Sequence, residues 1–219
     1  MEIFLSIDGV LRNTIQKFDY HYKDFYFDSD VENTENTTDF EYKVTEPIYS
    51  NNLLNHYNFQ SKEEFENFLF IEFPIEIFGH ANTSYQGVIT DLNKLIYDNK
   101  EVNFTIVGLD ELGKSRPATL FFLSKNGFMG HNIKFIKSED IKNMWDKCDV
   151  WITDSEKIIV ECPKEKTSIK FNTSYNQYFT NQKEISKLTE ITELWSKSLE
   201  NPTTLTLTES QTNVEQETT

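Results

Sequence analysis

A short apolar run that ends in an Asp-Gly pair is the feature that most constrains the fold of this chain. Residues 3–7 read Ile-Phe-Leu-Ser-Ile, and Asp8-Gly9-Val10 follows. Apolar residues at successive strand positions are typical of a parallel strand covered on both faces, because neighbouring side chains point to opposite sides of a sheet. We therefore predict a buried strand over residues 2–8, in a sheet that carries helices on both faces.

Strand and helix patterns alternate along the second half of the chain. After a helix capped by Thr90, strands are predicted over residues 102–108, 132–136 and 149–154, and helices between them over 117–127 and 138–146. Short elements follow at 158–161 and 168–171, and a last helix is predicted over 185–199. Strands that alternate with helices pair in parallel through helical crossovers. The predicted fold class is α/β, a Rossmann-like parallel sheet flanked by helices.

Residues 17–85 are predicted to form an insertion between the first and second strands of this sheet. Aromatic and acidic residues alternate over 17–45, which predicts a two-stranded hairpin with a long polar loop. Ser61 and Glu64 form a capping box, so residues 51–79 are predicted to contain one or two helices. The insertion is therefore predicted to combine a hairpin with aromatic helices.

The charge balance argues against nucleic acid and membranes as partners. Asp and Glu number 36 against 21 Lys and Arg, which gives a net charge of −15 and a surface that repels phosphate backbones and anionic lipid. No apolar run approaches the ~18 residues of a membrane span, and no leader segment is recognisable. Residues 201–219 are so polar that they are predicted to form a flexible tail.

The metal-ligating residue types are scattered. Cys148 and Cys162 have no zinc-site spacing, and the four histidines are widely separated. Two unpaired cysteines are typical of reduced thiols, so a cytoplasmic location is expected. The strong usage of Asn, Lys, Phe, Tyr and Ile is typical of AT-rich genomes, bacteriophage among them.

Polar groups stand at three of the predicted strand ends. Ser6 and Asp8 close the first strand, Gly108 closes the second, and Thr153-Asp154 closes the strand over 149–154. Because ligands of open α/β sheets bind at the carboxyl ends of the strands, these groups are candidates for one site. Two simpler interpretations stay open, in which Asp8-Gly9 is an ordinary turn and Asp154 is a helix N-cap.

The stretch Ile3–Val10 resembles the first motif of the haloacid dehalogenase-like superfamily, hydrophobic-hydrophobic-Asp-x-Asp-Gly-(Val/Thr), except that Ser6 stands in place of the first Asp. Residues 118–125 and the pair Tyr175-Asn176 resemble the 5′(3′)-deoxyribonucleotidase branch and its phage-encoded relatives. The resemblance implies a core of residues 1–16 and 86–200 and a cap of residues 17–85. In that cap the phenylalanines at 65, 68 and 73 are either core packing or a cover over a base-binding pocket.

The resemblance also implies roles at the first motif and at the metal site. Asp8 matches the general acid/base and a Mg²⁺ ligand, and Gly9 matches the motif glycine beside the phosphate. Ser6 occupies the position of the nucleophile. Asp154 matches the one surviving metal-binding carboxylate of the fourth motif, preceded by Thr153.

The phosphate-binding positions match less well. Gly108 falls where the second motif carries a Ser or Thr whose hydroxyl holds phosphate. Lys142 falls near the position of the third motif's lysine, with Lys147 and Lys125 as alternatives. A site of this kind would bind phosphate with fewer groups than the family pattern supplies.

The missing carboxylate at Ser6 decides the functional hypothesis. Phosphoryl transfer in this family needs an in-line carboxylate and a Mg²⁺ ion that neutralises it, and the substitution removes both a nucleophile and a metal ligand. The first hypothesis is a catalytically impaired domain, without a cofactor, that binds other proteins in a phage or enzyme assembly, partly through residues 201–219, in the host cytoplasm or a virion. The alternatives are an active Mg²⁺-dependent nucleotidase or phosphomonoesterase, and a nucleotide-binding regulator without turnover.

Overall fold

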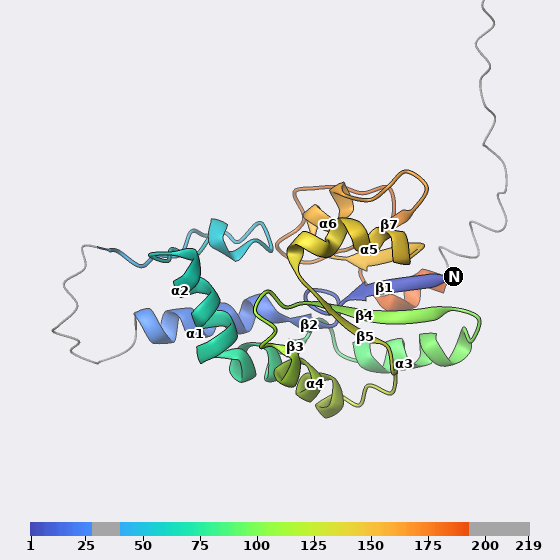
Figure 1. Cartoon of the computed structure of the whole chain (residues 1–219), viewed down its shortest axis with the longest axis horizontal. Coiled ribbons are helices and arrows are strands. Elements are labelled where there is room, and N and C mark those ends of the chain that lie inside the picture. The colour runs from blue at the N-terminus through green and yellow to red at the C-terminus, as the bar shows by residue number, and fades with distance from the viewer. Residues whose placement is uncertain (28–39, 193–219) are drawn as a thin grey trace, which may run out of the picture.

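A six-stranded parallel sheet forms the centre of the molecule (Figure 1). The computed structural model describes residues 1–27 and 40–192. The strands are β1 (Glu2–Ser6), β4 (Asn103–Leu109), β5 (Ile133–Ile136), β6 (Val150–Thr153), β7 (Thr167–Phe171) and β8 (Glu184–Ile185), in the order β5-β4-β1-β6-β7-β8. When the six strands of this sheet are numbered 1 to 6 along the chain, their order is 3-2-1-4-5-6, which is the order of doubly wound Rossmann sheets. The predicted α/β class is confirmed.

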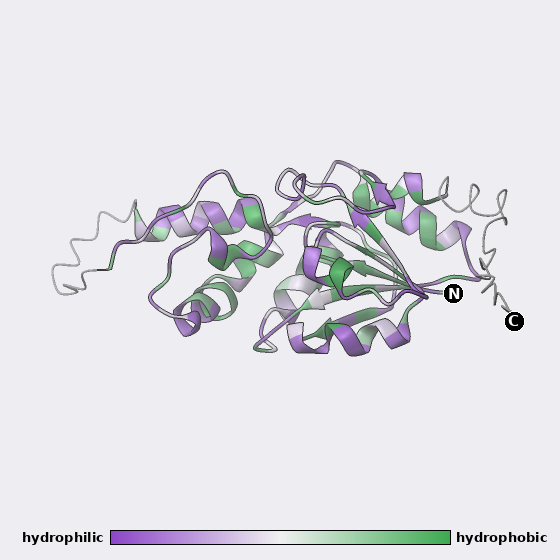
Figure 2. Cartoon of the chain, turned by 90° about the horizontal axis from the view of Figure 1, so that it is seen from above, coloured by the Kyte–Doolittle hydropathy of each residue, from purple (hydrophilic) through white to green (hydrophobic). Residues whose placement is uncertain are grey.

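Helices cover both faces of the sheet, as the apolar run in β1 requires. Ile3 and Leu5 point to the face covered by α3 (Val88–Asp98) and α4 (Arg116–Lys125). Phe4 points to the opposite face, where it packs with Trp151 under α5 (Ile141–Met144) and α6 (Glu156–Val160). In Figure 2 the strands are coloured mainly as hydrophobic, whereas the helices around them are mixed.

The strand order reverses between β1 and β6. One crossover leads from β1 toward β4 and β5, and the other leads to β6, β7 and β8. Ligands of doubly wound sheets bind in the crevice beyond the carboxyl ends of the strands at this reversal. In this chain Ser6 and Thr153 end the two strands that flank it.

The segment between β1 and β4 packs its own aromatic cluster beyond the carboxyl ends of the strands (Figures 1 and 2). It contains the short ribbon β2 (Arg12–Asn13) and β3 (Asn82–Thr83), the helices α1 (Thr14–Tyr26) and α2 (Lys62–Asn67), a 3₁₀ turn at Leu53–Asn55 and π-helical turns at Phe68–Glu72 and Ile75–Gly79. Phe18 and Phe68 lie at the centre of the cluster, with ring centroids 5.5 Å apart. Aromatic burial therefore holds this segment together.

The hairpin predicted over residues 17–45 is wrong in its first half. Residues 14–26 form α1, because Phe18 and Tyr22 lie four residues apart on one buried helix face and the Asn13 side chain caps the first turn by accepting the Gln16 N–H. The second half has one antiparallel bridge, between Val44 and Tyr57. Residues 28–39 lie outside the described residues.

The helix predicted over 185–199 begins later than predicted, because residues 185–190 are not α-helical whereas Ile191 and Thr192 are. Ile185 belongs to β8 and pairs with Phe171 of β7, and a 3₁₀ turn follows at Leu188–Glu190. Burial of Ile185 against the edge of the sheet outweighs its helical spacing. Residues 193–219, which include the predicted tail, lie outside the described part of the chain.

Smaller differences concern element boundaries. Thr90 lies inside α3, which begins after Gly87, a residue in the left-handed region at φ +92°. The helix predicted over 138–146 is a 3₁₀ turn at Ser138–Asp140, then α5, then a 3₁₀ turn at Trp145–Lys147. Over residues 1–27 and 40–192, none of the helices has the length and apolar character needed to cross a bilayer.

Candidate functional site

The hydroxyl of Ser6 is fully engaged at the sheet reversal. It donates to the Thr153 Oγ1 atom at 2.8 Å and accepts from the Trp151 indole N–H at 3.1 Å. Ser6 is 8% exposed. Neither a threonine hydroxyl nor an indole can take a proton from serine at neutral pH, so Ser6 has no general base among its hydrogen-bond partners.

Asp8 is paired with a buried arginine. Arg12 donates from Nε to Asp8 Oδ1 at 2.7 Å and from Nη2 to Asp8 Oδ2 at 3.2 Å, and the Thr14 hydroxyl also donates to Oδ1. The intervening turn is closed by the Gly9 N–H, which donates to the Arg12 carbonyl at 2.9 Å. A bidentate guanidinium–carboxylate pair is among the strongest polar contacts in proteins. Both oxygens of Asp8 therefore accept hydrogen bonds from within the chain, although the side chain is still 34% exposed.

Arg12 also joins this turn to the insertion and to α4. Its Nη1 atom donates to the Phe78 carbonyl at 3.3 Å and to the Thr119 hydroxyl at 3.0 Å. Its guanidinium carbon lies 4.7 Å from the centre of the Phe78 ring, and the side chain is almost completely buried. Turning Arg12 away from Asp8 would bury an unpaired cation, so the ion pair is fixed in place.

Asp154 lies beneath the Asp8-Gly9 turn. It is 4% exposed, and its Oδ2 atom accepts from the Tyr175 hydroxyl at 2.7 Å and from Asn51 Nδ2 at 3.5 Å. Burial, together with the negative charge of Asp8, raises the pKa of Asp154 to about 7. Close to neutral pH this carboxyl is therefore partly protonated.

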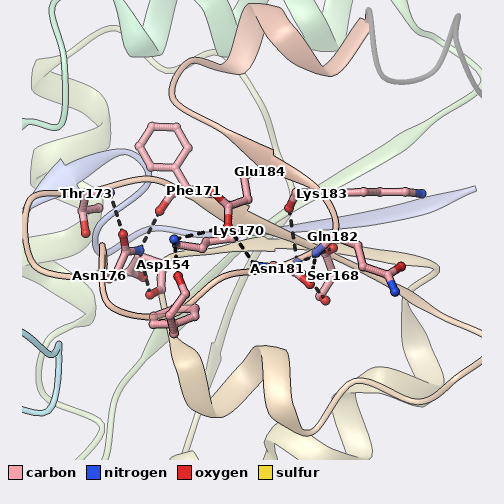
Figure 3. Close-up of polar contacts among 11 residues, drawn as sticks. Asp154, Ser168, Lys170, Phe171, Thr173, Asn176, Asn181, Gln182, Lys183 and Glu184 are labelled. Carbon is pink, nitrogen blue, oxygen red and sulfur yellow. Dashed lines mark hydrogen bonds and ion pairs between the residues drawn. The ribbon is translucent and has the colours of Figure 1, made fainter.

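Gly9 and Asn176 set the position of Asp154. Gly9 has φ +75°, and a Cβ atom there would overlap the Asp154 carboxyl group, so only glycine allows this approach. Asn176 donates to the Asp154 carbonyl at 3.2 Å and to the Phe171 carbonyl at 2.8 Å, and accepts the Thr173 N–H (Figure 3). The loop after β7 is thereby tied to the end of β6.

The end of β4 carries a third carboxylate, Asp110. The strand continues through Gly108, which pairs with Phe135, and ends at Leu109. Asp110 is 4% exposed, and its Oδ1 atom accepts the backbone N–H groups of Lys114 and Ser115 at 3.0 and 3.1 Å. Asp110 is absent from the predicted site, although a polar residue directly after an apolar strand is a signal that the sequence offers.

The loop that contains Asp110 matches a phosphate-binding pattern in sequence but not in geometry. Residues 108–115 read Gly-Leu-Asp-Glu-Leu-Gly-Lys-Ser, which fits G-x-x-x-x-G-K-[ST] between a strand and a helix. In that motif the backbone N–H groups bind phosphate. Here the Asp110 carboxylate takes the N–H groups of Lys114 and Ser115, and Arg116 Nε lies 3.5 Å from its second oxygen. The Asp110 carboxylate therefore takes the place that a phosphate would have in that motif.

The predicted lysines do not join this group. Lys125 donates to the Gly79 carbonyl at 3.4 Å and lies beside Phe121, against the insertion. Lys142 and Lys147 are exposed and form no hydrogen bond or ion pair with any residue of the described ranges. The structure brings together Ser6, Asp8, Gly9, Thr153 and Asp154, and the cation it supplies is Arg12.

The donor set at this edge does not fit Mg²⁺. Magnesium requires oxygen ligands in octahedral geometry, usually with one or two free carboxylates. Asp8 binds Arg12 and Thr14, while Asp154 accepts from Tyr175 and from Asn51. Within the described residues, no three or more His, Cys, Asp or Glu side chains are grouped so that they could hold a metal ion.

Comparison with known proteins gives little further information. No family model matches the sequence, and no curated protein sequence matches it. Among solved structures, the chain is similar to a haloacid dehalogenase-like hydrolase from Burkholderia xenovorans, with a TM-score of 0.49 and 12% sequence identity over 90% of this chain and 97% of that one. A likeness at this level says nothing about activity, and the α/β assignment rests on the strand order.

Proposed function

We propose that the chain is a haloacid dehalogenase-like domain that does not hydrolyse phosphomonoesters and serves as a protein-binding or structural module. The observation that carries the proposal is the bidentate pair between Asp8 and the buried Arg12, next to a serine at the nucleophile position. The pair neutralises the only acid of the first motif. It also uses the oxygens through which that acid would bind a metal or transfer a proton.

The chemistry at Ser6 supports the same conclusion. Loss of a covalent nucleophile lowers the rate by about 10⁴–10⁶ in enzymes where it has been measured. Serine replaces a nucleophile only when a base takes its proton, and the partners of Ser6 are Thr153 and Trp151. The arrangement therefore supports packing at the end of β1 rather than bond formation to phosphorus.

The surface of the insertion supports a role in protein binding. Several large apolar side chains there are at least two-fifths exposed: Tyr20, Phe25, Phe27, Ile71 and Ile75. Phe25 also packs against the partly buried Phe73, with ring centroids 5.4 Å apart. Exposed aromatic residues are typical of protein interfaces, and the net charge of −15 favours a basic partner surface.

Phosphate release from deoxynucleoside monophosphates in the presence of Mg²⁺ tests the proposal. We expect the unmodified chain to release no more phosphate than an Asp8→Asn variant. A Ser6→Asp variant places a carboxylate where Thr153 and Trp151 can donate to it, with Ser6→Asn as the uncharged control of the same shape. Release by Ser6→Asp alone would support descent from a phosphatase.

Three results would overturn the proposal in different ways. Release by the unmodified chain that is abolished in Asp8→Asn would establish the Mg²⁺-dependent nucleotidase. A rise in melting temperature with nucleotides, without release, would favour the nucleotide-binding regulator, because a ligand of the folded state stabilises it. A chain that stays monomeric and unbound in sedimentation experiments with candidate partner proteins would argue against the binding role.

A further inference from the structure

Helix α4 is apolar on both of its sides. Phe122 and Leu123 are buried on its inner side, whereas Leu120 and Phe121, the two residues before them, are 47% and 42% exposed on its outer side. A helix that packs through one side carries polar residues on the other, and exposed apolar residues are unfavourable unless function requires them. Because α4 lies at the outside of the molecule, its outer side is open to a partner (Figure 1).

The exposed residues form one stripe along α4. Pro117, Leu120, Phe121 and Ser124 are all exposed, and their positions i, i+3, i+4 and i+7 place them on the same side of the helix. At the insertion the stripe meets His80, whose ring centroid lies 5.3 Å from that of Phe121. We call these four residues of α4 the α4 stripe.

The α4 stripe lies in a stretch of the sequence that lacks acidic residues. Residues 112–138 contain five Lys or Arg and no Asp or Glu, although about four acidic residues would be expected at the average content of the chain. Since the whole chain has a net charge of −15, the residues outside this stretch have a net charge of −20. The stretch that contains α4 therefore has the opposite charge to the rest of the chain.

A cation stands at each end of the α4 stripe. Arg116 lies one turn before Leu120, and its side chain is 58% exposed although Asp110, whose side chain is completely buried, pairs with it. Lys125 lies one turn after Phe121, and its Nζ atom is 5.8 Å from the centre of the Phe121 ring. Nine positions separate the two cations, which is about 14 Å along a helix. The outer side of α4 thus has apolar side chains between two positive charges.

The surface is hollowed at both ends of α4. A cavity of about 500 Å³ is lined by residues of 81–90 and by Lys125 and Asn126, and Lys125 is the one charged residue among its described lining. A cavity of about 470 Å³ at the other end is lined by Arg116 and Lys137, together with three acidic residues. A carboxylate that enters the first cavity would meet a cation and no like charge in this lining.

We propose that the α4 stripe binds an acidic amphipathic helix of a partner protein. Apolar side chains of that helix would pack on Leu120 and Phe121, and its carboxylates would lie near Arg116 and Lys125. The proposal rests on the protein-binding part of the proposed function and adds a surface whose preferred partner is acidic, whereas the insertion favours a basic one. Nucleic acid and anionic bilayers are disfavoured, because the net charge of −20 outside residues 112–138 repels such large anions.

A display library of amphipathic helices, each about 16 residues long, tests the proposal against the immobilised full chain. Every member carries Leu along one side of the helix, and each position that flanks this side is Glu or Lys at equal frequency. We expect the peptides enriched on the chain to carry more Glu than Lys, because Glu complements the cations at the ends of the stripe. Fluorescence anisotropy of a labelled enriched peptide then gives its Kd.

Variants show whether the peptide binds to the α4 stripe. The double variant Leu120→Gln/Phe121→Gln should weaken binding by at least about 10-fold, since it removes two central apolar contacts. Lys125→Glu should weaken it about 3- to 10-fold, because attraction becomes repulsion. Tyr97→Gln is the matched control and should leave Kd unchanged, because Tyr97 is an aromatic residue of α3 that is 71% exposed. Melting curves of all variants check that the fold is retained.

Several results would contradict the proposal. It fails if no library member binds, if the enriched peptides carry as much Lys as Glu, or if the double variant binds them as tightly as the unmodified chain. Binding of phosphatidylserine vesicles or duplex DNA that is lost in the double variant would assign the stripe to a lipid or nucleic-acid partner instead. Self-association in sedimentation experiments that is lost in the double variant would assign it to a second copy of the chain.

Phosphate release measured on the same proteins separates this proposal from the proposed function. Release by the unmodified chain would refute the absence of hydrolysis but would leave the peptide result unchanged, because the α4 stripe contains none of the residues grouped around Ser6. Failure of every peptide to bind, without phosphate release, would remove the α4 stripe and leave the non-hydrolytic domain in place.

Discussion

The buried carboxyl of Asp154 makes the stability of the protein depend on pH in a direction that can be tested. Its pKa is about 7 in the folded chain against an ordinary value of 3.8, so between these values the folded state holds a proton that the unfolded state has lost. Stability from this group is complete below about pH 4 and falls as the pH rises toward 7. An Asp154→Asn variant cannot ionise, and its amide oxygen can still accept from Tyr175.

The gain in unfolding free energy expected for Asp154→Asn follows from the linkage between proton binding and folding. Each pH unit over which only the folded state is protonated corresponds to about 1.4 kcal/mol. Over an experimental window from about pH 5.5 to 8.5, chosen to avoid the sequence pI of about 4.7, the difference in unfolding free energy between Asp154→Asn and the unmodified chain should grow by about 2 kcal/mol. For a chain of this size that is about 4–8 °C in melting temperature.

Urea denaturation followed by circular dichroism across this window provides the measurement. Asp149→Asn is the control, because the Glu2 N–H lowers the pKa of Asp149 and its effect on stability should not change between pH 5.5 and 8.5. A difference for Asp154→Asn that stays constant with pH would refute the assigned environment. Stabilisation of the unmodified chain by Mg²⁺ at pH 8, absent in Asp154→Asn, would contradict the conclusion about the donor set.

Two further substitutions test the contacts around Asp8. Arg12→Met should lower the unfolding free energy by about 1–3 kcal/mol, because it leaves the Phe78 carbonyl and the Thr119 hydroxyl without their donor and removes the partner of the partly exposed Asp8. Adding Asp8→Asn should recover part of this loss, and strictly additive effects in denaturant titrations would disprove the coupling. Gly9→Ala should lower the melting temperature by several degrees, since the methyl group meets Asp154 and φ is +75°; an unchanged transition would show that the turn can move.

The sheet is largely predictable from the sequence, and the reason is local. Strands β1, β4 and β6 lie in mostly apolar stretches whose neighbouring residues face both helical layers, so the pattern in Ile3–Ile7 is visible without knowledge of the fold. Helix α1 is harder to predict because alternation of aromatic and acidic residues imitates a strand, while Phe18 and Tyr22 also satisfy helical spacing. The two-residue strand β8 is too short to produce a pattern at all.

The candidate site is less predictable because its partners are distant in sequence. The adjacency of Ser6 and Thr153 follows from the rule for strand ends, although 147 residues separate them. Arg12 binds Phe78 and Thr119, which lie 66 and 107 residues away. These contacts cannot be predicted from the spacing of residues in the sequence. Among the contacts of Arg12, the one with Asp8, four residues away, is close enough in sequence to leave a local signal.

The tryptophan beside Ser6 gives the protein an intrinsic optical probe. Trp151 lies edge-on to Phe4 and 5.3 Å from Trp145, with both indoles fully buried. Two indoles this close share their electronic transitions, so the aromatic circular dichroism of the chain should carry a band that disappears when this packing loosens. Ultraviolet spectra alone would then reveal whether a substitution at the end of β1 has disturbed the tertiary structure or only the chemistry.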